Sequence, residues 1–140
     1  MKPTSAGYSD TPLSRKLGLK AGMRFIALDP PANLDALLAD APELTRLARV
    51  SEFDFGLAFA ASERDAVAAL AKLGPRMVDA GMLWVAWPKK SSGVPTDLSE
   101  DAVRRAGLAA KLVDVKVCAI DATWSGLKFV RRLSNRGARG

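Results

Sequence analysis

Residues 87–103, WPKKSSGVPTDLSEDAV, bring together side chains that can bind an anion. Lysine ammonium groups and serine or threonine hydroxyls donate hydrogen bonds, and glycine permits a tight backbone turn. A helix that begins just after them adds free amide groups and the positive end of its dipole. The chemistry indicated is binding of a phosphate, a carboxylate or the phosphates of a nucleotide. The candidate ligand-binding residues are Lys89, Lys90, Ser91, Ser92, Gly93 and Thr96, with Trp124 of "DATWSG" as a further residue able to line a pocket.

A solvated connection between a strand and a helix is the alternative interpretation of the same stretch. Asp97 can cap the following helix, Glu100 stands three residues on, and Asp101 adds a second negative charge to the first turn. These charges compete with an incoming anion and offer partners to the lysines. The phosphate-loop motif G-x-x-x-x-G-K-[ST] is absent. Trp124, likewise, has the alternative of covering the edge of the core.

The chain contains no histidine and one cysteine, Cys118. Nucleophiles activated by histidine and the commonest zinc sites are therefore excluded. Cys118 lies in an apolar segment without a CxxC motif, so we expect a small buried residue there. Lys116 and Lys128 alternate with apolar neighbours, so we expect them to face solvent or an opposite charge. The sequence predicts no catalytic residue and no metal site, and it favours a protein that is not an enzyme.

Positive charge is concentrated at the two ends of the chain. The net charge is +6, while residues 25–130 carry more acidic than basic side chains. Basic ends give weak, salt-sensitive attraction to polyanions, so nucleic acid is not an expected partner. The first residues have no apolar signal segment, and the longest apolar stretch, 82–87, is too short to span a bilayer. With a single cysteine and no possible intrachain disulfide, the expected location is the cytoplasm, away from membranes.

Apolar periodicity predicts strands that alternate with helices. This order predicts a three-layer α/β domain over residues 1–132, with a mostly parallel sheet and a C-terminal antiparallel hairpin. We expect residues 133–140 to form a basic, disordered tail. The predicted strands are 23–29, 45–50, 53–60, 82–87, 112–120 and 127–132, and the predicted helices are 11–18, 32–41, 62–74 and one from about Asp97.

Two resemblances follow from these segments. Gly81 and Met82-Leu83, with the final hairpin, resemble the C-terminal half of a Rossmann-like methyltransferase. The segments "GYSDTPLSRKLGLKAGM", "GMLWVAWPKKSSGVPTDLSEDAVR" and "LVDVKVCAIDATWSGLKFVRR" are similar to a family of small bacterial proteins known as a domain of unknown function. The resemblance implies a methyltransferase-like fold but no activity.

The first predicted strand differs from the methyltransferase pattern where the cofactor would lie. Methyltransferases that this chain resembles carry a glycine-rich turn there, whereas this chain has "DPPAN" after the strand, a rigid turn begun by Asp29. Glu52 would be at most a displaced ligand of the cofactor's ribose. S-adenosylmethionine (SAM) is therefore not the favoured cofactor. The sequence favours a non-catalytic, methyltransferase-like scaffold that binds a small anionic ligand or a protein partner; the alternative is a divergent transferase that uses SAM or a nucleotide near residues 88–97.

Overall fold

The computed structural model describes residues 12–132, so the predicted tail at 133–140 lies outside the described residues. The alternating strands and helices build one six-stranded sheet in the order β2-β1-β3-β4-β6-β5. The first four strands in this order are parallel, whereas β6 is antiparallel to both β4 and β5. This topology confirms the predicted α/β fold and its C-terminal hairpin. The strands are β1 (Arg24–Leu28), β2 (Thr45–Arg46), β3 (Phe53–Phe59), β4 (Met77–Pro88), β5 (Leu112–Ala119) and β6 (Trp124–Arg131).

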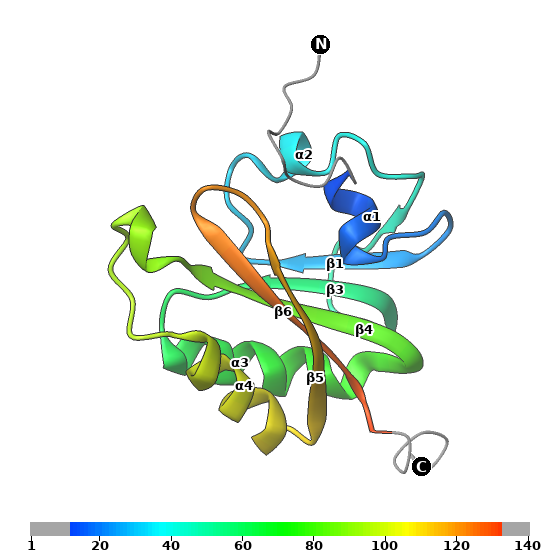
Figure 1. Cartoon of the computed structure of the whole chain (residues 1–140). Helices are drawn as coiled ribbons and strands as arrows, with labels where there is room; N and C mark the ends of the chain where they lie inside the picture. Colours follow the sequence, from blue (N-terminus) through cyan, green and yellow to red (C-terminus); the bar gives the residue numbers. More distant parts are fainter. Residues whose placement is uncertain (1–11, 133–140) are drawn as a thin grey trace.

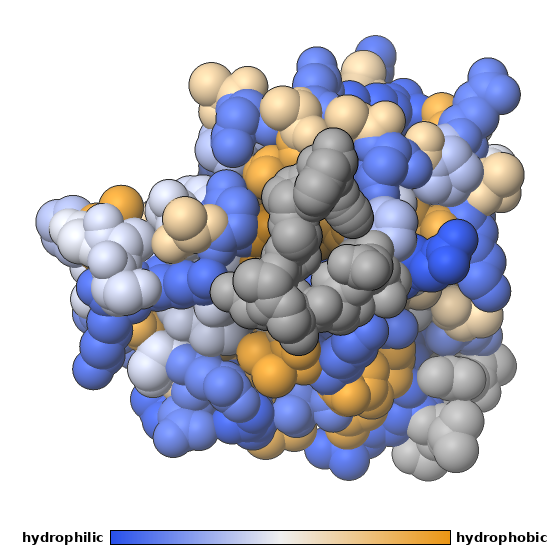
Figure 2. Space-filling view, turned by 45° about the horizontal axis from the view of Figure 1, so that its top comes forward, coloured by the Kyte–Doolittle hydropathy of each residue, from blue (hydrophilic) through white to orange (hydrophobic). Residues whose placement is uncertain are grey.

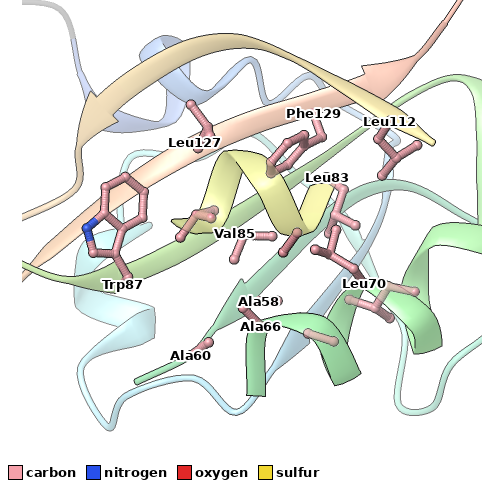
Figure 3. Close-up of a cluster of buried hydrophobic side chains, with 14 of the residues drawn as sticks. Ala58, Ala60, Ala66, Leu70, Leu83, Val85, Trp87, Leu112, Leu127 and Phe129 are labelled. Atoms are coloured by element: carbon pink, nitrogen blue, oxygen red, sulfur yellow. The ribbon is translucent and has the colours of Figure 1, made fainter. Parts of the chain in front are cut away.

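Helices cover the sheet on two sides, which gives three layers (Figure 1). The helices α3 (Glu63–Leu73) and α4 (Glu100–Ala109) pack on one face, and the shorter α1 (Leu13–Leu17) and α2 (Leu34–Leu37) lie on the other. Each face of the sheet therefore has its own hydrophobic core. Figure 3 shows the core under α3 and α4, where Leu83 and Val85 of β4 meet Leu127 and Phe129 of β6. A strand buried on both faces explains why β4 is almost entirely apolar between residues 82 and 87.

The start of β4 differs from the prediction because the strand carries a bulge. It begins at Met77 instead of residue 82, and the ladder with β3 shifts register between Phe53 and Phe55. Gly81 makes this shift possible, since a Cβ there would lie 3.0 Å from the carbonyl oxygen of Asp54 and 2.9 Å from Met77 Cγ. Two other predicted elements are shorter than expected. β2 has two residues and α2 has four, next to the proline-bounded links that surround them.

Arg24 ties the beginnings of β1 and β3 together through Asp54. Its Nε and Nη2 donate to the two carboxylate oxygens of Asp54 at 3.0 and 3.2 Å, and its backbone amide donates to Oδ2 at 2.8 Å. These hydrogen bonds favour the ionised carboxyl, so the pKa of Asp54 lies below its ordinary value of 3.8, chiefly because of the Arg24 side chain.

The depressed pKa of Asp54 predicts a loss of stability in acid. The ionised carboxyl stabilises the fold at every pH above 3.8, and this contribution disappears as the pH falls through the lower pKa of the folded state. Asp54→Asn should therefore lower the free energy of unfolding at neutral pH, and the difference from wild type should shrink towards about pH 2. Urea unfolding at both pH values measures it, with Glu52→Gln as the control because its oxygen lies 3.8 Å from Arg24. A difference that stays constant with pH would contradict the assignment.

Hydrophilic residues cover most of the face seen in Figure 2, and the hydrophobic residues on that face form separate patches. Among residues 12–132, no helix is long and apolar enough to cross a membrane. The same residues contain no group of three or more Asp, Glu, His or Cys side chains placed to hold a metal ion.

Candidate functional site

The strand order places a topological switch point between β1 and β3. The chain leaves β1 towards β2 on one side and returns to β3 on the other, with Leu28 and Ala58 as neighbours in the ladder. In open α/β sheets, ligands bind in the crevice outside the carboxyl ends of the strands at such a point. The residues that follow β1 and β3 therefore form the edge at which a ligand is expected.

Asp29, directly after β1, adopts a left-handed backbone conformation with φ of 53°. Glycine adopts this region most readily, and aspartate is one of the few other residues that tolerate it. The chain thus makes, at Asp29, the kind of turn for which glycine is suited, although Pro30 and Pro31 follow. Its carboxylate is exposed at the carboxyl edge of the sheet.

A cavity of about 250 Å³ lies beside this turn. Small alanine side chains on α3 leave room for it, and two carboxylates and one ammonium group supply its polar lining. β3 ends at Phe59, and the two residues that follow it, Ala60 and Ala61, have small side chains. The residues that line the cavity are Leu28, Asp29, Asp65, Ala68, Ala69 and Lys72.

The predicted anion-binding loop follows β4, the next strand along the sheet. Lys89 is half-buried, and Lys90 and Ser91 are exposed. Ser92 donates from Oγ to the carbonyl of Lys89 at 2.6 Å and accepts from the amide of Val94. The positive φ of Gly93, 78°, ends the short 3-10 turn Lys90–Ser92. The hydroxyl of Ser92 is thus engaged within the loop, whereas both lysine side chains remain available.

Thr96 fastens the other end of the loop to the segment that follows β3. Its Oγ1 donates to the carbonyl of Ala61 at 2.6 Å and accepts from the amide of Leu98 at 3.0 Å. Asp97 does not cap the helix that follows it, which corrects the prediction. Its Oδ1 accepts from the amide of Glu63 at 2.8 Å, at the start of α3.

Ser99 caps α4, since its Oγ accepts from the amide of Ala102 at 3.1 Å. The acidic residues of the first turn bind Arg104, at 2.6 Å for Glu100 and 2.8 Å for Asp101. The same guanidinium also contacts Asp114 at 2.9 Å. The predicted pairing of the loop lysines with these two carboxylates is therefore not what the structure shows.

Trp124 is the first residue of β6, which corrects the predicted start of this strand at residue 127. Asp121 Oδ1 accepts from the amides of Thr123 and Trp124, both at 2.8 Å, and so makes the turn shorter than predicted. The indole meets the ring of Phe59 edge to face, with 5.0 Å between the ring centroids. The amide of Lys89 donates to the carbonyl of Thr123 at 2.8 Å, so the structure does bring the start of the loop beside Trp124.

Glu52 lies at the opposite edge of the sheet, where β1 and β3 begin, with Arg24 at 3.8 Å. Its assignment as a displaced ribose ligand is therefore wrong. The residues that sequence reasoning missed as site candidates are those of α3, Asp65 and Lys72. Their helical spacing marked an exposed face, and no local signal places that face next to Asp29.

No family model matches the chain, and no curated protein matches it in sequence. The resemblance to a small bacterial family therefore stays a prediction. Solved structures do match, and several of them are methyltransferases. The structure is similar to CalO1, a methyltransferase in calicheamicin biosynthesis, with a TM-score of 0.64 and 14% identity over 86% of this chain and 52% of CalO1. This chain thus spans about half the length of CalO1.

Two smaller proteins are matched over more of their length. A TehB-like SAM-dependent methyltransferase from Corynebacterium glutamicum gives a TM-score of 0.56 and 11% identity, over 91% of each chain. Fibrillarin from Aeropyrum pernix gives a TM-score of 0.53 and 16% identity, over 84% of this chain and 73% of fibrillarin.

The expectation that SAM is not favoured is wrong in the light of these matches. The CalO1 structure is of the form bound to S-adenosylhomocysteine (SAH), and fibrillarin holds natively bound SAM. The prolines of "DPPAN" predict an obstacle to the cofactor, yet the backbone makes a left-handed turn at Asp29, before the prolines begin. The chain has the fold of SAM-dependent methyltransferases.

Proposed function

We propose that this protein binds SAM as a divergent, methyltransferase-type transferase, with the cofactor at the carboxyl ends of β1 and β3. The observation that carries the proposal is the left-handed turn at Asp29, which puts an exposed carboxylate at the switch point of a methyltransferase-like sheet. The proposal includes a cytoplasmic location, which the single cysteine supports.

The residues at this edge fit the polar groups of the cofactor. Asp29 and Asp65 can accept hydrogen bonds from an ammonium group or from ribose hydroxyls, and Lys72 can donate to a carboxylate. The cofactor, when bound, would supply the methyl group. The 88–97 loop, with Lys89 and Lys90, lies after the next strand and would contact the second substrate. The anionic ligand predicted from this loop would then be the second substrate. That ligand stays a prediction.

Binding of SAH to the full chain tests the proposal. Isothermal titration calorimetry should show binding by the wild type, and SAH at a hundredfold its dissociation constant should stabilise the fold by about 2.7 kcal/mol. Asp29→Asn keeps a side chain that tolerates the left-handed turn but removes the charge, so it should weaken binding about tenfold.

Asp40→Asn is the matched control, because Asp40 is exposed, lies outside the lining of the cavity and has only its backbone carbonyl engaged, by Ser14. It should leave the affinity for SAH unchanged. Absence of any binding of SAH or SAM to the wild type would overturn the proposal, and equal affinity of Asp29→Asn and wild type would overturn the placement of the cofactor.

A further inference from the structure

Two lysines face each other in the β5–β6 ladder, on the side of the sheet that α1 covers. Lys116 and Lys128 are direct cross-strand partners. The Nζ of Lys116 donates to the carbonyl of Lys16 in α1 at 2.8 Å. The Nζ of Lys128 lies within 3.9 Å of the position of a Cβ on Gly18, the residue that ends α1. Like charges placed opposite each other in a ladder destabilise it, so this pairing needs compensation.

Lys128 is the lysine on which the neighbouring positive charges act. Its side chain is half-buried, and Gly18, which lies near its ammonium group, also has Met82 as a neighbour. Its pKa is lowered, first by burial and then by repulsion from Lys116 and Lys20. Within residues 12–132, no carboxylate offsets these effects and no hydrogen bond or ion pair engages its ammonium group. Lys116 is exposed and Lys128 is half-buried, and the charge that Lys128 faces is a like charge instead of the opposite charge offered as one of its predicted surroundings.

Four arginines of the described chain bind an oxygen that offsets their charge. Arg24 binds Asp54, Arg46 binds Asp35, and Arg104 binds three carboxylates. Arg131 donates to the carbonyls of Gly74 and Met77. A half-buried lysine between two others, without an acid among residues 12–132, departs from this pattern, and a bound anion would neutralise it.

We propose that Lys20, Lys116 and Lys128 form a binding site for a compact phosphoryl group, separate from the cofactor edge. The ammonium groups of Lys116 on β5 and Lys128 on β6 both lie beside the end of α1. Lys20, two residues after Gly18, adds a third positive charge that acts on Lys128. The site lies four residues along β6 from Trp124, or about 13 Å at the rise of a strand. Its neighbours on β5 are Val115, Val117 and the buried Cys118, so the positive charge does not continue along the strand as a track for nucleic acid.

Titration of the ¹⁵N-labelled full chain with inorganic pyrophosphate tests the site. NMR shifts should appear at the amides of residues 16–20, 116 and 128, and the pKa of Lys128 should rise when the anion is bound. Lys128→Met keeps the apolar stem and should weaken the affinity at least about tenfold, while the fold stays at least as stable because the repulsion is removed. Arg105→Met is the control for charge, since Arg105 is exposed on α4 across the sheet, and it should change the affinity less than about twofold.

Three results would overturn the proposal. Lys128→Met could bind pyrophosphate as tightly as wild type. The shifts could fall at residues 88–93 instead, which would place the anion on the loop after β4. A 12-residue oligouridylate could bind through Lys128 while pyrophosphate does not, which would make the ligand an extended nucleic acid. The binding of SAH is measured separately, so its failure would leave this test intact.

Discussion

Gly107→Ala should lower the free energy of unfolding by about 2–3 kcal/mol, although alanine is the better helix former. Gly107 is buried in α4, and a Cβ there would lie closer than 3.0 Å to three carbons of the Phe129 ring. Phe129 is fully buried in the core that Figure 3 shows, between α4 and the sheet, so its ring has no free space to enter. Helix and strand must therefore separate, and chemical denaturation followed by circular dichroism measures the loss.

Two further variants distinguish this clash from a general effect on the helix. Leu108→Ala, one residue on and 41% exposed, should change stability by less than about 0.5 kcal/mol. Phe129→Leu should recover part of the stability when combined with Gly107→Ala, since the smaller side chain gives the new methyl group room. A Gly107→Ala protein as stable as wild type would contradict the close approach of α4 to β6.

Trp84→Phe should cost about 2–3 kcal/mol of unfolding free energy and should loosen α1 in particular. Trp84 is fully buried, and its Nε1 donates to the carbonyl of Leu17 at 2.9 Å. Phenylalanine removes the donor, leaves that carbonyl without a buried partner and opens a gap beneath α1. Hydrogen exchange of the amides of residues 16–19 should accelerate more than exchange in α3.

Trp87→Phe provides the matched control on the other face of the sheet. Trp87 is 6% exposed, and its indole N–H makes no hydrogen bond to any residue between 12 and 132. The same truncation there should cost less, and it should leave exchange in α1 unchanged. Equal costs for both variants would mean that the hydrogen bond to Leu17 contributes nothing measurable.

The pattern of apolar residues was sufficient to predict the layers of this fold and most strands. Leu83, Val85 and their neighbours form an uninterrupted run because both faces of β4 are covered, and Ser62 caps α3 as its spacing with Asp65 predicts. The start of β4 at Met77 was not predictable, because the bulge beside Gly81 depends on the partner strand β3 and not on local sequence.

The candidate sites depended still more on contacts distant in sequence. A register shift at Val115 sets Lys116 opposite Lys128; without it, Val115 would follow Asp114 in register and take that place. No property of "VDVKVC" reveals the shift. In the same way, the hydroxyls of Ser92 and Thr96 were expected to meet a ligand, yet nearby backbone groups engage both. Short polar side chains also form hydrogen bonds with the protein backbone, and sequence alone does not distinguish this role from ligand binding.

The loop after β4 is anchored at both of its ends, by Lys89 to Thr123 and by Thr96 to Ala61. Only the six residues between these anchors are able to swing, and the short 3-10 turn stiffens half of them. The space at the carboxyl ends of the strands, beside this loop, therefore changes little in width. A molecule that enters it would be selected by how well it matches a preformed shape, and little ordering entropy would be lost on its arrival.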